Sequence, residues 1–317
     1  MQRRDFLKKG ATGTMAFALS GLVLAPTSAQ AADTVVYNLT ATGGMKALID
    51  GASIFTWSFE DSAGQSGPGS ISSGMVVSEG STIEVNLTNN LDRAINFTIP
   101  GVMGSTPSIA PGSSYTYTFA APAAGSYMYT DDVNGFIGKA MGLAGPLVVT
   151  PVNGTATLYT GGPSFAKQYT LFMSDMDDRL NAAVQAGGTY NINDYEPNYY
   201  FANGLSYPDT KDYADTSVTM TVGTDVALRL ICAGVIEYPM HFHGYHVNVI
   251  SRNRVLETEV IDKDTPLVRP NEAVDVILPV LQAGAYPLHT HYVPGVTANG
   301  VYPNPYGGSL IIMSASN

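Results

Sequence analysis

Short runs in which apolar and polar residues alternate recur along the chain from Thr34 onward. Residues 81–87 read Ser-Thr-Ile-Glu-Val-Asn-Leu, and residues 114–119 carry an aromatic side chain at every second position. A period of two is typical of a β-strand that buries one face. Apolar patterns of this kind predict further strands at 145–149, 169–173, 217–222, 226–232, 241–250, 273–278 and 309–313. Residues 178–185 are predicted to form one short helix.

Both halves of the chain contain many short strands, which favours two β-sandwich domains. Residues 151–163 are rich in Gly, Thr and Pro and interrupt the strand pattern. We therefore predict an N-terminal domain at 32–150, a linker at 151–165 and a C-terminal domain at 166–317. A Tyr- and Asn-rich stretch at 187–207 is predicted to be a loop. With 45% hydrophobic residues, the chain has the apolar content of a folded protein.

The first 31 residues have the features of an export signal. A twin arginine, Arg3-Arg4, precedes an apolar run at 11–25, and Ala29-Gln30-Ala31 supplies small residues for cleavage. The run is short for a transmembrane helix and is interrupted by Gly and Thr. The pattern is similar to a twin-arginine (Tat) signal, so we expect a periplasmic or secreted protein with no stable membrane anchor after cleavage.

The mature chain is strongly acidic. Cleavage would remove four basic residues and one acidic residue, which takes the formal charge from −11 to −14. Such a surface repels nucleic acid, so nucleic-acid partners are excluded. Cys232 is the only cysteine, so the chain can form no internal disulfide.

All five histidines of the protein fall into two short segments. His241, His243 and His246 lie in one segment, and His289 and His291 lie in the other. In an extended strand, side chains at positions i and i+2 share a face and lie about 6.6–6.8 Å apart. Each His-x-His pair therefore projects two imidazoles in one direction, and two adjacent strands would bring four together. His246 falls on the opposite face of a regular strand.

Clustered imidazoles indicate a transition-metal site, for which Cu, Zn, Fe and Ni are all suitable ions. The alternative is two unrelated pairs of surface or core histidines. The absence of histidine anywhere else in the chain favours the metal site.

These segments resemble the multicopper oxidases, and the resemblance covers nearly the whole mature chain. The family carries His-Pro-x-His-x-His-Gly and, some tens of residues later, His-Cys-His in its last domain. Residues 238–244 (Tyr-Pro-Met-His-Phe-His-Gly) and 289–291 (His-Thr-His) match in order and spacing. In the first half, 125–129 and 142–147 are similar to the family's Gly-Thr-Tyr-Trp-Tyr and Gly-Leu-x-Gly-Pro-Leu. The resemblance implies two tandem cupredoxin-like Greek-key β-sandwiches and a copper cofactor, with zinc as the weaker candidate.

The departures from the family pattern limit the chemistry. The family binds its type 1 copper with a Cys thiolate and two His, and these positions hold Thr290, Tyr238 and Gly295. The N-terminal half of the trinuclear copper cluster is also absent, because Thr98-Ile-Pro100 and Thr130-Asp-Asp132 replace the two His-x-His pairs. The resemblance therefore implies a half-cluster held by His241, His243, His289 and His291, without type 1 copper.

Several roles remain open at this point. The chain could be a copper-dependent oxidoreductase acting on a small substrate or redox partner, a non-enzymatic copper buffer or carrier, or a cell-envelope scaffold of the same fold. A zinc-dependent hydrolytic site is a weaker alternative. No catalytic residue is assigned. His246, Asp132, Tyr238, Tyr245 and Tyr292 are candidates for supporting positions, and the resemblance to trimeric two-domain copper proteins suggests a homotrimer.

Overall fold

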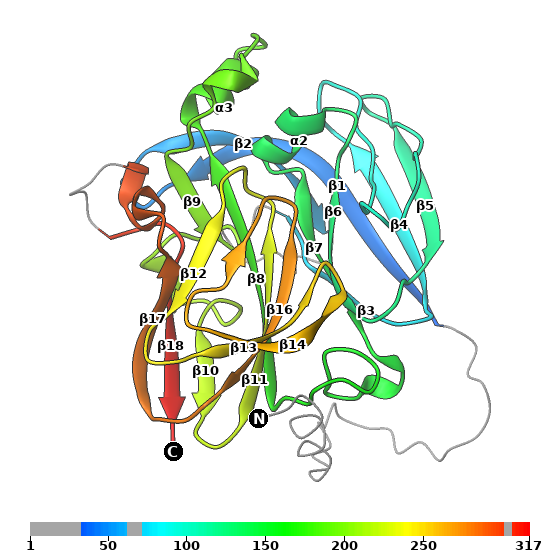
Figure 1. Cartoon of the computed structure of the whole chain (residues 1–317). Helices are drawn as coiled ribbons and strands as arrows, with labels where there is room; N and C mark the ends of the chain where they lie inside the picture. The colour runs from blue at the N-terminus through cyan, green and yellow to red at the C-terminus, as the bar shows by residue number, and fades with distance from the viewer. Residues whose placement is uncertain (1–32, 62–71, 301–305) are drawn as a thin grey trace.

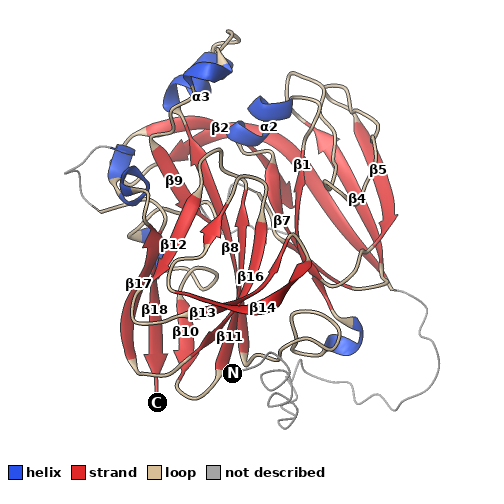
Figure 2. Cartoon of the chain, viewed as in Figure 1, coloured by secondary structure: helices blue, strands red, loops and turns tan. Residues whose placement is uncertain are grey.

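The computed structural model describes residues 33–61, 72–300 and 306–317. The predicted export signal lies outside these residues. Strands dominate the described part and helices are few and short (Figure 2). No helix among the described residues is long and apolar enough to cross a membrane. The all-β prediction is confirmed.

The N-terminal domain is built from two sheets. The first has strand order β2-β1-β4-β5, and the second has order β3-β7-β6, with helix α2 (Gly135–Met141) between β6 and β7. The strands are β1 (Thr34–Ala47), β2 (Ser53–Asp61), β3 (Met75–Ser78), β4 (Thr82–Asn89), β5 (Ser114–Ala120), β6 (Gly125–Thr130) and β7 (Ala144–Thr150). In β4 the apolar residues at 83, 85 and 87 are fully buried, as their alternation predicts.

The C-terminal domain also has two sheets, of orders β10-β18-β17-β12-β15 and β14-β13-β16-β11-β8-β9. One group of strands is β8 (Lys167–Met176), β9 (Tyr199–Ala202), β10 (Val218–Thr221), β11 (Asp225–Cys232), β12 (Tyr238–Phe242) and β13 (Val247–Arg252). The others are β14 (Val255–Lys263), β15 (Leu267–Val268), β16 (Ala273–Pro279), β17 (Gly284–Thr290) and β18 (Leu310–Ser316). In Figure 1, β12 and β17 lie on the side of the molecule opposite β4 and β5.

Helix α3 (Asp178–Gln185) occupies the range predicted from the sequence. It begins after Asp177, whose side chain accepts a hydrogen bond from the backbone N–H of Arg179, as expected of an N-cap. Asn181 on α3 donates to the carbonyl of Phe55 in β2 at 2.7 Å, so this helix of the C-terminal half packs on the N-terminal domain. Short 3₁₀ helices occur at Val152–Gly154, Ile192–Asp194, Asp209–Lys211, Val293–Val296 and Ala298–Gly300.

Two predicted segments differ from the structure. The strand expected over 241–250 is two strands, because Gly244 adopts a left-handed φ of 73° and the backbone turns between β12 and β13. The loop expected over 187–207 contains β9, whose four residues are all buried. Neither the turn nor the short buried strand has a period that distinguishes it from its surroundings.

Candidate metal site

The four histidines of the two His-x-His pairs lie on one face of the β12–β17 strand pair. These strands are antiparallel, and His241 is paired directly with His289. The pairing continues beyond the strand ends, because the backbone N–H of His243 donates to Pro287 O at 3.0 Å and that of His291 to Pro239 O at 2.8 Å. The opposite face presents the buried side chains of Met240, Phe242, Leu288 and Thr290. The two pairs predicted from the sequence are therefore brought together.

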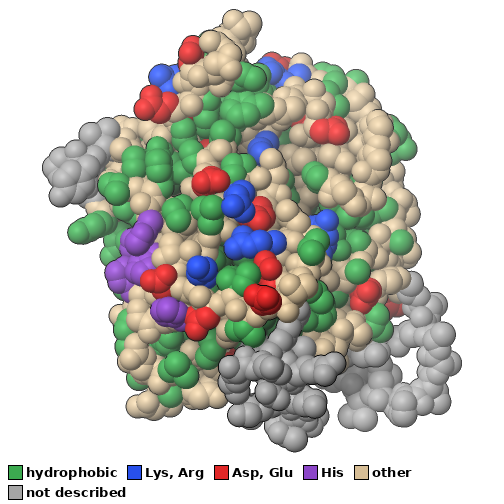
Figure 3. All heavy atoms as spheres, viewed as in Figure 1, with side chains coloured by type: hydrophobic (Ala, Val, Ile, Leu, Met, Phe, Trp, Pro, Cys, Tyr) green, Lys and Arg blue, Asp and Glu red, His purple; other side chains and the backbone are tan. Residues whose placement is uncertain are grey.

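The imidazole rings are close neighbours. Ring centroids are 4.5 Å apart for His241–His243 and for His241–His291, 5.1 Å for His243–His289 and 5.5 Å for His289–His291. The Nε2 atoms of His243 and His289 lie 2.9 Å apart and share a hydrogen bond. Histidine side chains gather at one edge of the surface, with acidic side chains beside them (Figure 3).

Two of the rings are oriented through their second nitrogen. His289 Nδ1 lies 2.9 Å from Thr290 O, and because a carbonyl only accepts, Nδ1 carries the proton and Nε2 keeps its lone pair. His241 Nδ1 lies 2.9 Å from the hydroxyl of Thr265 and 3.9 Å from a carboxylate oxygen of Asp264. Such outer contacts fix ring orientation at metal sites. Neither Thr265 nor Asp264 is among the site residues predicted from the sequence.

The surroundings favour neutral imidazoles. Burial lowers the pKa of His241 below its usual value, and the neighbouring His291 and His243 lower it further. Burial is also the main cause that lowers the pKa of His289, against the hydrogen bond to Thr290 O, which raises it. A neutral imidazole offers the lone pair that a metal requires.

In the described part of the chain, no group of three or more His, Cys, Asp or Glu side chains is already arranged to hold a metal ion. Binding one ion through both His243 Nε2 and His289 Nε2 would require the hydrogen bond between them to break. The 2.9 Å between these nitrogens equals the separation of two ligands at right angles around an ion with bonds of about 2.0–2.1 Å. Four imidazoles are a donor set that suits copper.

The positions that correspond to the type 1 copper site of the multicopper oxidases are closed by packing. Tyr238 is fully buried and donates from its hydroxyl to Ser174 O at 2.9 Å. Thr290 is also fully buried. A Cβ at Gly295 would lie 2.6 Å from Thr290 Cγ2, which leaves no room there for an imidazole. These residues form a packed part of the core, and Tyr238 faces away from the histidines.

The remaining candidate residues have other partners in the structure. His246 Nδ1 pairs with Asp262 Oδ1 at 2.7 Å, and both side chains are more than 60% exposed. Asp132 hydrogen-bonds with Asn96 inside the N-terminal domain. The Tyr245 hydroxyl donates to Gln282 O at 2.5 Å. The Tyr292 ring packs against that of Tyr200, 5.8 Å away.

Comparisons with known proteins relate the chain to copper oxidases. Residues 69–154, in the N-terminal half, match the family model for multicopper oxidases. The chain is 25% identical to a laccase-like protein of Oryza sativa subsp. japonica over 223 residues, which are 64% of this chain. The chain spans 40% of the length of that relative. Residues 69–154 are thus similar to a multicopper oxidase domain, and the chain is similar to part of a laccase-like protein.

Solved structures agree on the fold. A blue copper oxidase from Nitrosomonas europaea superposes with a TM-score of 0.74 at 24% identity, over 89% of this chain and 86% of that one. The multicopper oxidase mgLAC also gives 0.74 at 24% identity, over 90% and 87%. A copper nitrite reductase from Nitrosomonas europaea gives 0.69 at 17% identity, over 90% and 95%. The chain therefore shares its fold with these cupredoxin-like copper proteins, as the sequence motifs predict.

Proposed function

We propose that this chain is an exported copper protein that holds one or two copper ions with His241, His243, His289 and His291. The observation that carries this proposal is the common face of the β12–β17 pair, on which four imidazoles lie with centroids 4.5–5.9 Å apart. The multicopper oxidase likeness makes copper the preferred ion. Zinc is the alternative that the same donor set permits.

Copper at this site would supply one-electron redox chemistry toward a small substrate. The chain's own residues supply the setting for it. Thr290 O and the Thr265 hydroxyl orient two of the rings. His291 is exposed, so the site opens to solvent and to a small molecule. The buried side chains beneath the strand pair hold both strands in register.

The site does not support the four-electron chemistry of a laccase. The type 1 positions are filled by Tyr238, Thr290 and Gly295, so no thiolate is available for electron entry. In the N-terminal domain, the residues that replace the second half-cluster bond to one another instead. Thr98 and Thr130 pair through their backbones, and Asp131 accepts from the backbone N–H of Asn96 at 2.9 Å.

A non-enzymatic copper buffer is the second candidate. The closed type 1 position favours it, because a site with no internal electron route can still take up and release a metal. The exposure of His291 also gives such a site access to solvent. Export by the Tat pathway and assembly as a homotrimer are further parts of the proposal, supported by the twin arginine and by the family resemblance.

The decisive experiment is metal analysis and EPR of protein purified from the periplasm of copper-supplied cells. We expect stoichiometric copper, an EPR signal typical of type 2 (non-blue) copper, and no intense blue colour. His241→Ala and His289→Ala should each remove most of the copper, because the two strands share the site. His246→Ala is the matched control and should keep it.

Copper-free protein from such cells would overturn both copper functions, and the cell-envelope scaffold would be the remaining role. Full copper occupancy in either His241→Ala or His289→Ala would overturn the shared site. Oxygen or nitrite consumption with an added electron donor then separates the redox enzyme, which consumes one of them, from the buffer, which consumes neither.

A further inference from the structure

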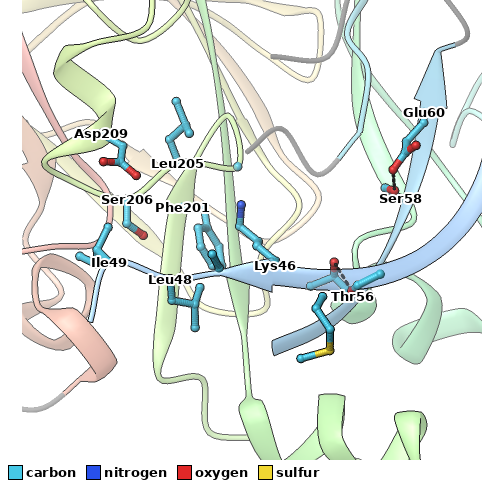
Figure 4. Close-up of a pocket in the computed structure, with 14 residues that line it drawn as sticks. Lys46, Leu48, Ile49, Thr56, Ser58, Glu60, Phe201, Leu205, Ser206 and Asp209 are labelled. Atoms are coloured by element: carbon cyan, nitrogen blue, oxygen red, sulfur yellow. Dashed lines mark hydrogen bonds between the residues drawn. The ribbon is translucent and has the colours of Figure 1, made fainter. Parts of the chain in front are cut away.

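A cavity of about 420 Å³ lies between the two domains, away from the histidine face. One wall is the β1–β2 hairpin of the N-terminal domain, and the other is the segment at 201–209 of the C-terminal domain. Figure 4 shows Lys46 pointing into the space between Phe201 and Thr56, with Asp209 and Glu60 on opposite sides. The volume falls in the range of small-molecule sites.

Three hydroxyl groups that line the cavity already donate hydrogen bonds within the protein. Thr56 donates to Gly44 O at 3.5 Å, Ser58 to Glu60 Oε1 at 3.0 Å, and Ser206 to Tyr200 O at 2.8 Å. A hydroxyl has one proton and two lone pairs, so these three side chains present acceptors to the cavity. The hydroxyl lining therefore favours a ligand with N–H or O–H donors.

The charged side chains that line the cavity differ in how deeply they are buried. Asp209 and Glu60 are exposed at the rim, whereas Lys46 is half-buried and lies 5.3 Å above the Phe201 ring. Burial lowers the pKa of Lys46 to about 8, against the nearby Asp209 carboxylate, which raises it. Phe201 and Leu205 are buried and supply an apolar floor. The cavity thus combines two anionic groups, one cationic group and an apolar surface.

We propose that this junction cavity binds a small zwitterion with an apolar side chain, of the amino-acid class. The carboxylate of the ligand contacts the Lys46 ammonium, and the ligand's ammonium group lies on the Asp209 side of the cavity, against that carboxylate and the Ser206 hydroxyl oxygen. Its side chain packs on Phe201 and Leu205. Because both domains contribute contacts, the ligand stabilises their junction.

The test uses three probes that share one apolar body. They are L-leucine, 4-methylpentanoate, which lacks the amine, and 3-methylbutylamine, which lacks the carboxylate. Binding to the full chain is measured by isothermal titration calorimetry at pH 7, after dialysis against EDTA so that leucine forms no copper chelate. We expect saturable one-to-one binding of leucine, and binding of each single-charge probe weaker by about tenfold or more.

Two variants locate the site independently. Lys46→Met and Asp209→Asn should each weaken leucine binding by about tenfold or more, since each removes one charge-assisted contact. Lys167→Met is the matched control, because Lys167 bonds to Thr219 outside the cavity, and it should bind leucine as the wild type does. Circular dichroism verifies that each variant is folded.

Failure of leucine to bind would overturn the proposal. So would binding of 4-methylpentanoate or 3-methylbutylamine as tight as that of leucine, because one charge would then suffice. Unchanged leucine binding in folded Lys46→Met and Asp209→Asn proteins would place the ligand elsewhere and overturn it as well.

Discussion

His241 and His289 face each other as direct partners in the antiparallel β12–β17 pair, with ring centroids 5.9 Å apart. This one register relationship determines the geometry of the whole histidine face. Since side chains alternate along each strand, pairing 241 with 289 places 243 and 291 on the same face at the two ends of the pair. A shift of either strand by one residue would turn its two imidazoles into the core.

Thr265 positions His241, and we predict that Thr265→Val lowers copper affinity by about tenfold to a hundredfold. The hydroxyl lies 2.9 Å from His241 Nδ1, and valine keeps the shape without the hydrogen bond. Competition with a calibrated copper chelator measures the affinity. Thr224→Val, which removes a local hydrogen bond to Thr221 O far from the site, should leave it unchanged. If Thr265→Val bound copper as tightly as Thr224→Val, Thr265 would have no positioning role.

The elements that could be predicted from the sequence are those with a local signal. Strand β4 alternates strictly and was predicted from its period, and α3 was predicted within its observed bounds. The single strand expected over 241–250 was wrong, because the turn depends on one glycine at a positive φ, which composition alone does not reveal.

The candidate site was predictable only in part. Each His-x-His pair is a local pattern, but the pairing of residues 48 positions apart depends on the tertiary fold, and only the family resemblance indicated it. The position of Tyr238 could have been anticipated. It is three residues from His241, so strand parity places it on the opposite face, where it packs in the core. Metal binding itself stays a prediction.

The junction of the two domains contains a buried ion pair whose disruption should be costly. Arg229 Nη1 lies 3.5 Å from Asp275 Oδ1, both side chains are buried, and Ser126 of the N-terminal domain bonds to both. We expect Asp275→Ala to lower the free energy of unfolding by about 3–5 kcal/mol, because it leaves a buried guanidinium without its counter-charge. Urea unfolding measures the change.

Asp92→Ala is the control for this loss. Its partner Arg93 lies 3.1 Å away, but Asp92 is 77% exposed, so solvent screens the pair and little stability should be lost. If both substitutions had the same small effect, the Arg229–Asp275 pair would not stabilise the junction.

Lys46 gives the protein a defined pH dependence. Its pKa is lowered from 10.5 to about 8 by burial in the folded state. Between these values the unfolded chain binds more protons than the folded one, so the contribution of Lys46 to stability rises as the pH increases from about 8 to about 10.5. Lys46→Met removes this contribution. We expect the variant to be more stable than the wild type at pH 7, by about 1–3 kcal/mol, with the difference fading toward pH 10.5.

Urea unfolding of both proteins at pH 7, 8.5 and 10 measures this difference. Lys167→Met gives the baseline for replacing an exposed lysine. A difference between Lys46→Met and wild type that stays constant over this range would contradict the assigned pKa.

Introducing a cysteine at position 290 should not create a blue copper centre. Thr290→Cys would place a thiol at the position of the family's thiolate ligand, but the other two positions hold Tyr238 and Gly295, neither of which supplies an imidazole. The Tyr238 hydroxyl is already bonded to Ser174 O, and in the wild-type chain a Cβ at Gly295 would lie 2.6 Å from Thr290 Cγ2. We therefore expect no intense blue absorption from copper-loaded Thr290→Cys. The four histidines lie on the other face of the strand pair, so copper content should equal that of the wild type. A blue product would show that the packed core can open to admit a copper ion beside residue 290.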